Sequence, residues 1–298
     1  MESKPIIPKF SIITATLNNF EGVAKTFASI NDQEIVDFDI EWIVVDGMSS
    51  DGTSTFVTRS QSNSELVFEV QLFSKPPIGI YDAMNFGASK ANGEYLLFLN
   101  SGDFFLQKDS LQKINSEFEM VPDVDCLALP VAHFTRDGFL YDVTVPQELD
   151  GQCHIHHQGA FLSRDLFQKI GGYDVSLKWA ADGKMLDKVA QIGSLYFGKS
   201  LAIGFEIGGA SAQNFPALLN EIDSYRRNTR SLTQQKFLIF KNWLKVRMIL
   251  IHHTRSSIMT RWYYLKRQAR ILEQASKDNR IEFLWSEFQK TTTKKNSK

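Results

Sequence analysis

Cysteine is scarce in this chain of 298 residues, and a long uncharged hydrophobic run is absent. The two cysteines, Cys126 and Cys153, are too few for a disulfide framework and favour a reducing compartment. The most apolar stretch, residues 237–251, is interrupted by three basic side chains, whereas a membrane-spanning helix needs about 18 or more consecutive apolar residues. The first ten residues have no charged start followed by an apolar segment, so we expect no signal peptide. These absences favour a soluble or membrane-peripheral protein.

Both glycine-rich phosphate-binding motifs are absent as well. The segment after the first predicted strand reads TATLNNFEG, without the G-x-G-x-x-G pattern, and the G-x-x-x-x-G-K-[ST] loop occurs nowhere in the chain. A nucleotide diphosphate bound here would need another anchor. A divalent cation on a carboxylate can serve, because Mg²⁺ typically uses one or two carboxylates together with substrate phosphates.

Alternating strand and helix patterns predict an α/β fold with a mostly parallel central sheet in the first hundred residues. Apolar runs rich in β-branched residues predict buried strands, and apolar residues at helical spacing predict the helices between them. The expected strands are residues 9–17, 40–47, 66–74 and 94–100, and the expected helices are residues 18–32, 49–59 and 80–91.

After residue 120 the pattern changes to short apolar segments, which predict a β-rich insertion. Residues 163–174 predict a short helix closed by a glycine pair, and residues 179–193 predict a further helix. From about residue 214 the chain reads as basic, aromatic helices only. We therefore expect an α/β domain over residues 1–213 and a helical region over residues 214–298.

Polar and acidic residues follow three of the predicted strands. In open α/β sheets, ligands bind beyond the carboxyl ends of the strands, so these residues should converge on one crevice. Asp103, which follows the fourth strand, suits a divalent cation, and Asp46 and Asp51, which follow the second, could hydrogen-bond a base or ribose.

Several motifs in a fixed order resemble the family 2 glycosyltransferases, which have the GT-A fold. They are VVDGMSSDGT, GIYDAMNFGASKANGEYLLFLNSGD, HHQGAFLSRDLFQKIGGYD and an aspartate on the next helix. The resemblance covers roughly residues 9–205 and is greatest to the bacterial branch that builds envelope polysaccharides. It implies an inverting hexosyl- or N-acetylhexosaminyltransferase. The donor would be a nucleotide-diphosphate sugar, with a preference for UDP, and the acceptor a glycan or a polyprenyl-linked molecule.

The resemblance also implies the residues of a donor site. The donor-binding residues would be Thr14, Ala15, Thr16, Asn18, Asp46, Ser49, Asp51, Asp82, Asn85, Asn100, Ser101, Gly102 and Asp103. Residues 100–103 occupy the place of the family's D-x-D motif, with Asp103 as the only acid. A Mn²⁺ or Mg²⁺ ion would therefore be held by Asp103.

An acid at the start of a helix in the second half of the chain is the family's general base. Asp182 fits this position, with Asp187 and Glu206 as weaker candidates. A carboxylate suits the reaction, because the base removes the proton of the acceptor hydroxyl as its oxygen attacks the anomeric carbon. The resemblance places His157 and Gln158 beside the sugar or acceptor.

Most of these residues have an ordinary structural alternative. Asp51 begins a common turn pair, Asp82 and Asn85 could lie on an exposed helix face, and Asp182 could simply favour the helix dipole. The histidines of HIHHQ, residues 154–158, lack the spacing and partners of a zinc site. An alternative to the enzyme is an inactive scaffold that binds sugar nucleotides or a membrane, since the D-x-D motif is reduced.

Charge is divided unevenly along the chain. Residues 225–298 hold 18 of the 33 basic residues and only 4 of the 34 acidic ones, a net charge of +14 against −15 for the remainder. Basic residues mixed with Trp, Tyr and aliphatic residues are typical of helices that bind anionic membrane surfaces. Packing or a homo-oligomer contact is the second possibility, and nucleic acid the least favoured. We expect a cytoplasmic protein peripheral to the inner face of the bacterial membrane.

Overall fold

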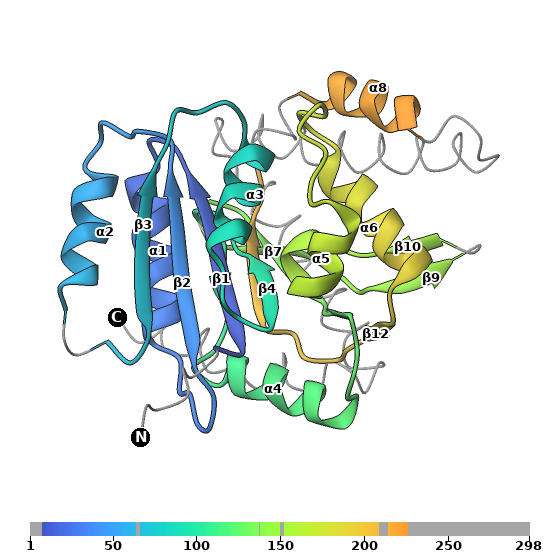
Figure 1. Ribbon diagram of the computed structural model, residues 1–298, viewed down its shortest axis with the longest axis horizontal. Coiled ribbons are helices and arrows are strands. Elements are labelled where there is room, and N and C mark those ends of the chain that lie inside the picture. The colour runs from blue at the N-terminus through green and yellow to red at the C-terminus, as the bar shows by residue number, and fades with distance from the viewer. Residues whose placement is uncertain (1–7, 64–65, 137, 150–151, 209–213, 226–298) are drawn as a thin grey trace, which may run out of the picture.

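A seven-stranded sheet forms the centre of the molecule, in a computed structural model that describes residues 8–63, 66–136, 138–149, 152–208 and 214–225 (Figure 1). The strand order is β12-β6-β11-β4-β1-β2-β3. All neighbouring strands run parallel except β11, which is antiparallel to both β4 and β6. The strands are β1 (Phe10–Thr16), β2 (Ile40–Asp46), β3 (Glu69–Ser74), β4 (Tyr95–Phe98), β6 (Cys126–Ala128), β11 (Ala160–Ser163) and β12 (Leu195–Phe197).

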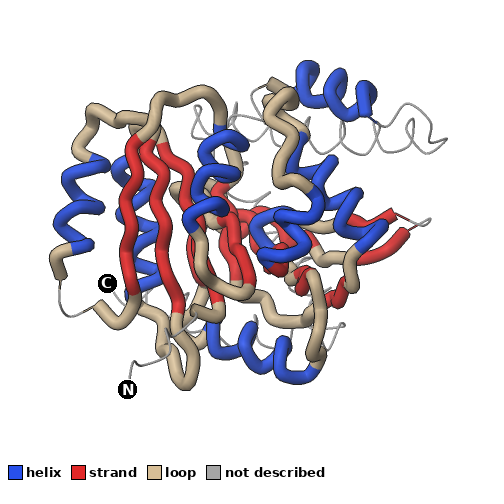
Figure 2. Tube along the Cα trace, viewed as in Figure 1, coloured by secondary structure: helices blue, strands red, loops and turns tan. Residues whose placement is uncertain are grey.

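Helices cover both faces of this sheet and enclose two hydrophobic cores (Figure 2). Successive strand residues point to opposite faces, so in β1 Phe10 and Ile12 lie in one core and Ile13 lies in the other. The first core is covered by α1 (Phe20–Asn31), α2 (Thr53–Gln61) and α4 (Ser110–Met120). The second is covered by α3 (Ile80–Lys90), α5 (Arg164–Ile170) and α6 (Ala181–Ile192).

A second, smaller sheet lies beside the first. Its order is β5-β13-β7-β8, and a separate hairpin pairs β9 with β10. The 3-10 helix η1 (His157–Gly159) precedes β11, and α8 (Phe215–Tyr225) contacts α6. The strands are β5 (Phe104–Phe105), β7 (Val131–Phe134), β8 (Leu140–Thr144), β9 (Gln147–Leu149), β10 (Gln152–His154) and β13 (Ile203–Glu206).

The predicted α/β fold with a mostly parallel sheet is confirmed, and the first four strands and three helices lie where the sequence pattern put them. The β-rich insertion expected after residue 120 needs correction, because its first strand, β6, joins the main sheet together with the later strands β11 and β12, whereas β7 and β8 lie in the second sheet. The strands β6, β11 and β12 have three or four residues each, which is too few to show the alternation of apolar and polar residues that identifies a strand.

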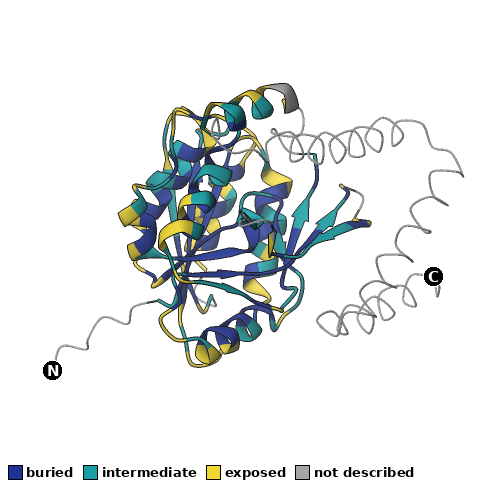
Figure 3. Cartoon of the chain, turned by 90° about the vertical axis from the view of Figure 1, so that its right-hand side faces the viewer, coloured by how far each residue is buried: buried dark blue, intermediate teal, exposed yellow. Residues whose placement is uncertain are grey.

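Buried residues fill the interior on both sides of the sheet (Figure 3). Among the helices that the structure describes, none combines the length and apolarity needed to cross a bilayer. Of the predicted C-terminal region, α8 is described, and residues 226–298 lie outside the described part of the chain.

Candidate active site

The carboxyl ends of β1, β2 and β4 meet at one edge of the sheet, where hydrogen bonds join their loops. The backbone N–H of Asn18, after β1, donates to Ser49 Oγ, after β2, at 2.7 Å. The side chain of Asn19 donates to Ser101 Oγ, after β4, at 3.0 Å. The predicted convergence of the three strand ends is therefore present.

Asp46 organises the loop after β2 from a fully buried position. Its carboxylate accepts the N–H of Ser49 at 3.1 Å, the hydroxyl of Ser49 at 2.5 Å and the hydroxyl of Ser54. Asn18, at a positive φ of 47°, accepts the N–H of Ser50 at 2.9 Å. These contacts fix the loop after β2 beside the end of β1.

Asp51 joins the starts of two helices. Its carboxylate accepts the hydroxyl of Thr53 at 2.6 Å, the N–H of Thr53 at 3.1 Å and the N–H of Phe20 at 2.9 Å. The Thr53 hydroxyl, with these N–H groups, lowers the pKa of Asp51 against the opposing effect of burial. Phe20 and Thr53 are the first residues of α1 and α2, so Asp51 holds the starts of these two helices together at the edge of the site.

Three other residues that were predicted to bind the sugar donor form ion pairs or hydrogen bonds within the protein. Asp82 forms an ion pair with Lys75. The Asn85 amide is held at both ends by the backbone of Tyr173, with two hydrogen bonds of 2.8 Å. The Thr14 hydroxyl is fully buried, donates to the Leu99 carbonyl at 2.7 Å and accepts from the Trp42 indole at 2.9 Å.

The two residues that follow Thr14 are placed differently from it and from each other. Ala15 lies in the second core, and Thr16, the last residue of β1, is 7% exposed with no partner for its hydroxyl. The side-chain alternation of the strand places Thr14 among the residues of the first core. Thr16 is thus the residue of this stretch whose side chain has an unused polar group.

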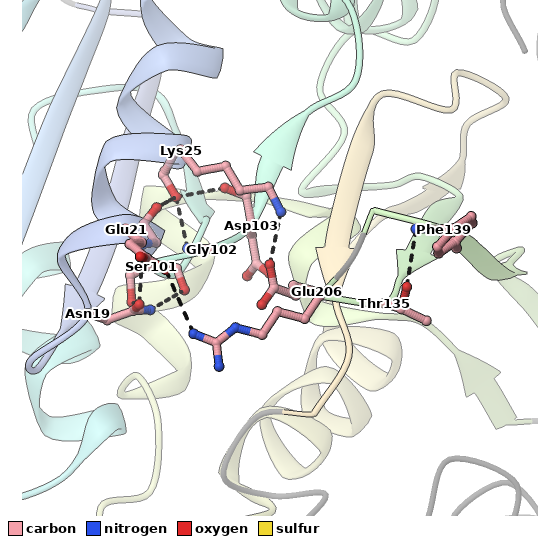
Figure 4. Close-up of polar contacts among 12 residues, drawn as sticks. Asn19, Glu21, Lys25, Ser101, Gly102, Asp103, Thr135, Phe139 and Glu206 are labelled. Atoms are coloured by element: carbon pink, nitrogen blue, oxygen red, sulfur yellow. Dashed lines mark hydrogen bonds and ion pairs between the residues drawn. The ribbon is translucent and has the colours of Figure 1, made fainter. Parts of the chain in front are cut away.

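Residues 100–103 form a tight turn that α1 holds in place (Figure 4). Gly102 has a φ of 104°, a conformation that favours glycine, and its N–H donates to the Gly22 carbonyl at 3.1 Å. The Thr26 hydroxyl donates to the Asp103 carbonyl at 2.7 Å. Asn19 also caps α1 by accepting the Gly22 N–H, so one helix start positions the whole turn.

The Asp103 side chain is 4% exposed and has few donors around it. Gln158 Nε2 donates to its carboxylate at 3.3 Å, and the backbone N–H of Glu206 provides a further bond. Burial raises the pKa of Asp103 to about 7, because the charge of His157 and these hydrogen bonds offset the loss of hydration only in part. Glu206 pairs with Lys25 at 3.0 Å beside this turn (Figure 4).

Asp182 lies in the first turn of α6 and is bonded on both oxygens. His157 Nδ1 is 3.0 Å from Oδ2, while the Tyr81 hydroxyl donates to Oδ1 at 2.9 Å and the Gly183 N–H at 2.8 Å. Burial raises the pKa of Asp182, but the hydrogen bond and charge of His157, with these other donors, more than offset it and lower the pKa. Asp182 is therefore an anion at neutral pH.

Buried polar atoms without a partner gather around these two aspartates. In the part of the chain that the structure describes, they include Thr16 Oγ1, Asn100 Oδ1, His156 Nδ1, His157 Nε2, Gln158 Oε1 and Tyr173 Oη. A buried polar atom left unpaired costs about 1–3 kcal/mol, so such groups are rarely left without a purpose. Their concentration here marks a place for a polar ligand.

The oxygen atoms at this edge suit a hard divalent cation. Asp103 supplies a carboxylate, and Asn100 and Gln158 each have a buried, unpartnered amide oxygen. Mg²⁺ and Mn²⁺ prefer such oxygen ligands. The described residues contain no group of three or more His, Cys, Asp or Glu arranged to hold a metal. Among the oxygen atoms named above, Asp103 supplies the carboxylate.

A separate open hollow of about 1130 Å³ is lined by Pro8, Lys9 and Glu94, which precede β1 and β4, and by further acidic residues. It lies at the amino ends of these strands, opposite the two aspartates. None of the buried unpartnered atoms belongs to its lining. The buried unpartnered polar atoms therefore favour the carboxyl edge of the sheet, and not this hollow, as the candidate ligand site.

The strand pattern had indicated Asp103, and the family resemblance had indicated Asp182, His157 and Gln158, but neither pointed to Tyr81 or Asn19. Asn19 has a local signal, since Asn is a preferred residue at a helix start. Tyr81 has none, because its partner Asp182 is 101 residues away in the sequence.

Sequence comparison with known proteins finds glycosyltransferases. The sequence profile described as glycosyl transferase family 2 matches residues 11–171. An uncharacterized glycosyltransferase of Mycobacterium tuberculosis is 29% identical over 189 residues, covering 62% of this chain and 70% of the relative. A PGL/p-HBAD biosynthesis glycosyltransferase of Mycobacterium bovis is 32% identical over 178 residues, covering 59% of this chain and 67% of the relative.

Two solved structures share the fold. S. aureus TarS 1–349 in complex with UDP-GlcNAc has a TM-score of 0.57 at 16% identity, covering 89% of this chain and 81% of TarS 1–349. The mannosyltransferase PcManGT from Pyrobaculum calidifontis, in complex with GDP-Man and Mn²⁺, has a TM-score of 0.57 at 15% identity with the same coverage. At these identities the likeness concerns the fold.

Proposed function

Because the chain belongs to glycosyl transferase family 2, we propose that it is an inverting glycosyltransferase which moves a hexosyl or N-acetylhexosaminyl group from a UDP-sugar. One observation carries this proposal: adjacent residues of η1 reach two aspartates at one sheet edge, since His157 contacts Asp182 and Gln158 contacts Asp103. The surroundings of the two carboxylates also shift their pKa values in opposite directions. Pairs of carboxylates in contrasting environments commonly divide the roles of a reaction between them.

Donor binding is assigned to the carboxyl ends of β1, β2 and β4. The loop held by Asp46 would take the nucleoside, and the turn of residues 100–103 would face the diphosphate. Asp103 would hold Mn²⁺ or Mg²⁺, with the amide oxygens of Asn100 and Gln158 beside it. When bound, the cation stabilises negative charge on the departing diphosphate.

Asp182 is assigned as the general base. Its carboxylate is ionised, and the Tyr81 hydroxyl and Gly183 N–H fix the orientation of Oδ1. It would accept the proton of the acceptor hydroxyl while that oxygen attacks the anomeric carbon. His157 donates to Oδ2 and thus holds the carboxylate toward η1. One displacement of this kind inverts the anomeric configuration.

The acceptor is proposed to be a cell-envelope glycan or a polyprenyl-linked molecule, as in a lipopolysaccharide or capsule. Support comes from the relative named for PGL/p-HBAD biosynthesis and from the basic, aromatic sequence of residues 226–298. That sequence also supports a peripheral location on the cytoplasmic face of the membrane. The UDP-GlcNAc complex of TarS supports a uridine nucleotide, while the GDP-Man complex of PcManGT makes guanosine donors the necessary comparison.

A donor screen tests the proposal. UDP- and GDP-sugars are added to the full chain with and without Mn²⁺, and both the thermal midpoint and the release of nucleotide are measured. A ligand that binds only the folded state raises the midpoint. We expect a UDP-sugar to do so only with Mn²⁺, with slow donor hydrolysis. Binding without hydrolysis or transfer would favour the inactive scaffold, and no response to any nucleotide sugar would refute donor binding.

A further inference from the structure

The start of α6 is capped by another helix. Its N-cap residue is Ala180, whose side chain cannot accept a hydrogen bond. Glu221, on α8, accepts the backbone N–H groups of Lys178 at 2.9 Å, Trp179 at 2.7 Å and Ala180 at 3.0 Å. One carboxylate thus satisfies three successive N–H groups and places negative charge at the positive end of the helix dipole.

A second contact ties α8 to the same turn. A side-chain carbon added at Gly183 would lie 3.0 Å from the Tyr225 hydroxyl, so α8 approaches the first turn of α6 closely (Figure 1). Ile222 is 9% exposed, and Tyr225 packs against the second core. The position of α8 is therefore fixed by packing as well as by Glu221.

Asp182 is the second residue of the helix that Glu221 caps. The backbone where α6 starts sets where the Asp182 carboxylate stands relative to Tyr81 and His157. We propose that Glu221 is a positioning residue for Asp182, so that α8 belongs to the transfer machinery although it lies beyond the α/β domain expected from the sequence. This inference rests on the proposed function, in which Asp182 accepts the acceptor proton.

The chain offers a matched control on the opposite face of the sheet. Glu117, on α4, accepts the N–H of Lys199 at 3.0 Å and of Ser200 at 2.6 Å. Glu117 thus also accepts successive backbone N–H groups with one carboxylate. However, α4 packs in the first core, whereas Asp182 lies on a helix that covers the second core. Loss of the hydrogen bonds to Glu117 should lower the stability of the fold without moving Asp182.

The experiment compares Glu221→Gln with Glu117→Gln in the full chain. Glutamine keeps the size of the side chain but replaces one acceptor oxygen with an NH₂ donor. For Glu221→Gln we expect faster hydrogen exchange at residues 178–180 and a fall in kcat of about tenfold or more, as small displacements of a catalytic group can cause. The donor KM and the donor-induced thermal shift should stay unchanged. For Glu117→Gln, exchange should rise at residues 199–200 with kcat unchanged.

Equal kcat values in the two variants, with exchange raised at residues 178–180 in the first, would overturn the inference. Glu221→Asp, which keeps the charge on a shorter side chain, should lose less kcat than Glu221→Gln. If both variants at 221 fail to fold, Glu221 is a stability residue and the inference is wrong. Wild-type protein that turns over no nucleotide sugar would instead refute the proposed function, and that result needs no variant.

Discussion

Asp103 and Asp182 are the same residue type at the same edge of the sheet, yet their surroundings have opposite effects. Asp103 is almost fully buried, and burial dominates, so its pKa rises to about 7. Asp182 is also penalised by burial, but His157, Gly183 and Tyr81 donate to it and keep its pKa below the usual range. His157 and the hydrogen bonds to the first carboxylate offset the cost of its burial only in part, and a bound cation would offset more of it, whereas the second carboxylate already has donors that keep it ionised.

Asp103→Asn should abolish the Mn²⁺-dependent part of donor binding. Asparagine has the same shape and an oxygen that can still accept an N–H, so the fold should persist, but it lacks the charge that holds a divalent cation. The measurement is the thermal shift produced by a UDP-sugar with and without Mn²⁺. Asp51→Asn is the control: it should lower the midpoint by weakening the bonds to α1 and α2 while keeping the Mn²⁺ effect. A full Mn²⁺ effect in Asp103→Asn would assign the cation to another residue.

Asp182→Asn should lower kcat by about 10² or more, the size of a lost general base. The amide cannot take up the acceptor proton, although it can still accept hydrogen bonds from Tyr81 and Gly183. Donor affinity should change little. Asp187→Asn, on the same helix, is the matched control and should retain its turnover. If Asp187→Asn is the variant that loses turnover at saturating acceptor, the role of base passes to Asp187.

At the scale of elements, β7, β13 and η1 enclose a pair of histidines. The ring centres of His133, on β7, and His156, beside η1, are 4.8 Å apart, and the His133 ring lies 5.4 Å from that of Phe205 on β13. Burial lowers the pKa of His133 to about 4 and that of His156 well below its usual value. Both rings are thus neutral in the folded protein, and protonation would favour the unfolded chain.

The contribution of His133 to stability should be lost as pH falls from about 6.5 toward 4. In this window the unfolded chain binds a proton that the folded protein does not, so the free energy of unfolding decreases with falling pH. Asp103 contributes the opposite slope between pH 7 and about 4, because its folded pKa is raised. The measurement is therefore the difference between wild type and His133→Gln in urea unfolding from pH 7.5 to 5. The variant should lose less stability than the wild type, and parallel curves would contradict the prediction.

At the scale of the whole molecule, the charge asymmetry is the main feature left unexplained by the fold. The structure shows that α8, at the start of the predicted helical region, packs against α6 and carries the acidic Glu221 and Asp223. The basic residues begin directly afterwards, at Arg226, in the part of the chain outside the described residues. The membrane prediction for the region from about residue 215 therefore rests on residues 226–298.

Residues 226–298 should bring the protein to anionic vesicles. Each basic residue near an anionic surface contributes about 1 kcal/mol, and the segment also carries Trp243, Trp262, Tyr263, Tyr264 and Trp285. Binding should weaken with added salt, because the screening length falls to about 8 Å at physiological ionic strength. Co-sedimentation of the full chain with anionic and with neutral vesicles is the measurement. Full chain left in the supernatant with anionic vesicles at low salt would assign the segment to packing or assembly.

The amino-acid sequence by itself determined the α/β class, the order of the first seven elements and the edge at which the polar residues converge. These features follow from local periodicity and from the rule that parallel strands present their carboxyl ends at one edge. Asp103 could be singled out because it follows a predicted strand, whereas Asp182 was singled out by the resemblance to family 2 glycosyltransferases, which places the base at the start of a helix.

Only the tertiary structure decided which side chains are available and what surrounds them. It directs the Thr14 hydroxyl into the first core, engages Asn85 with Tyr173 across 88 residues of sequence, and joins Glu221 to the start of α6 across about 40. It also places the four-residue β11 between β4 and β6. The physical reason is that burial and hydrogen bonding between distant segments set these contacts. Neither leaves a periodic signal in the sequence around the residues concerned.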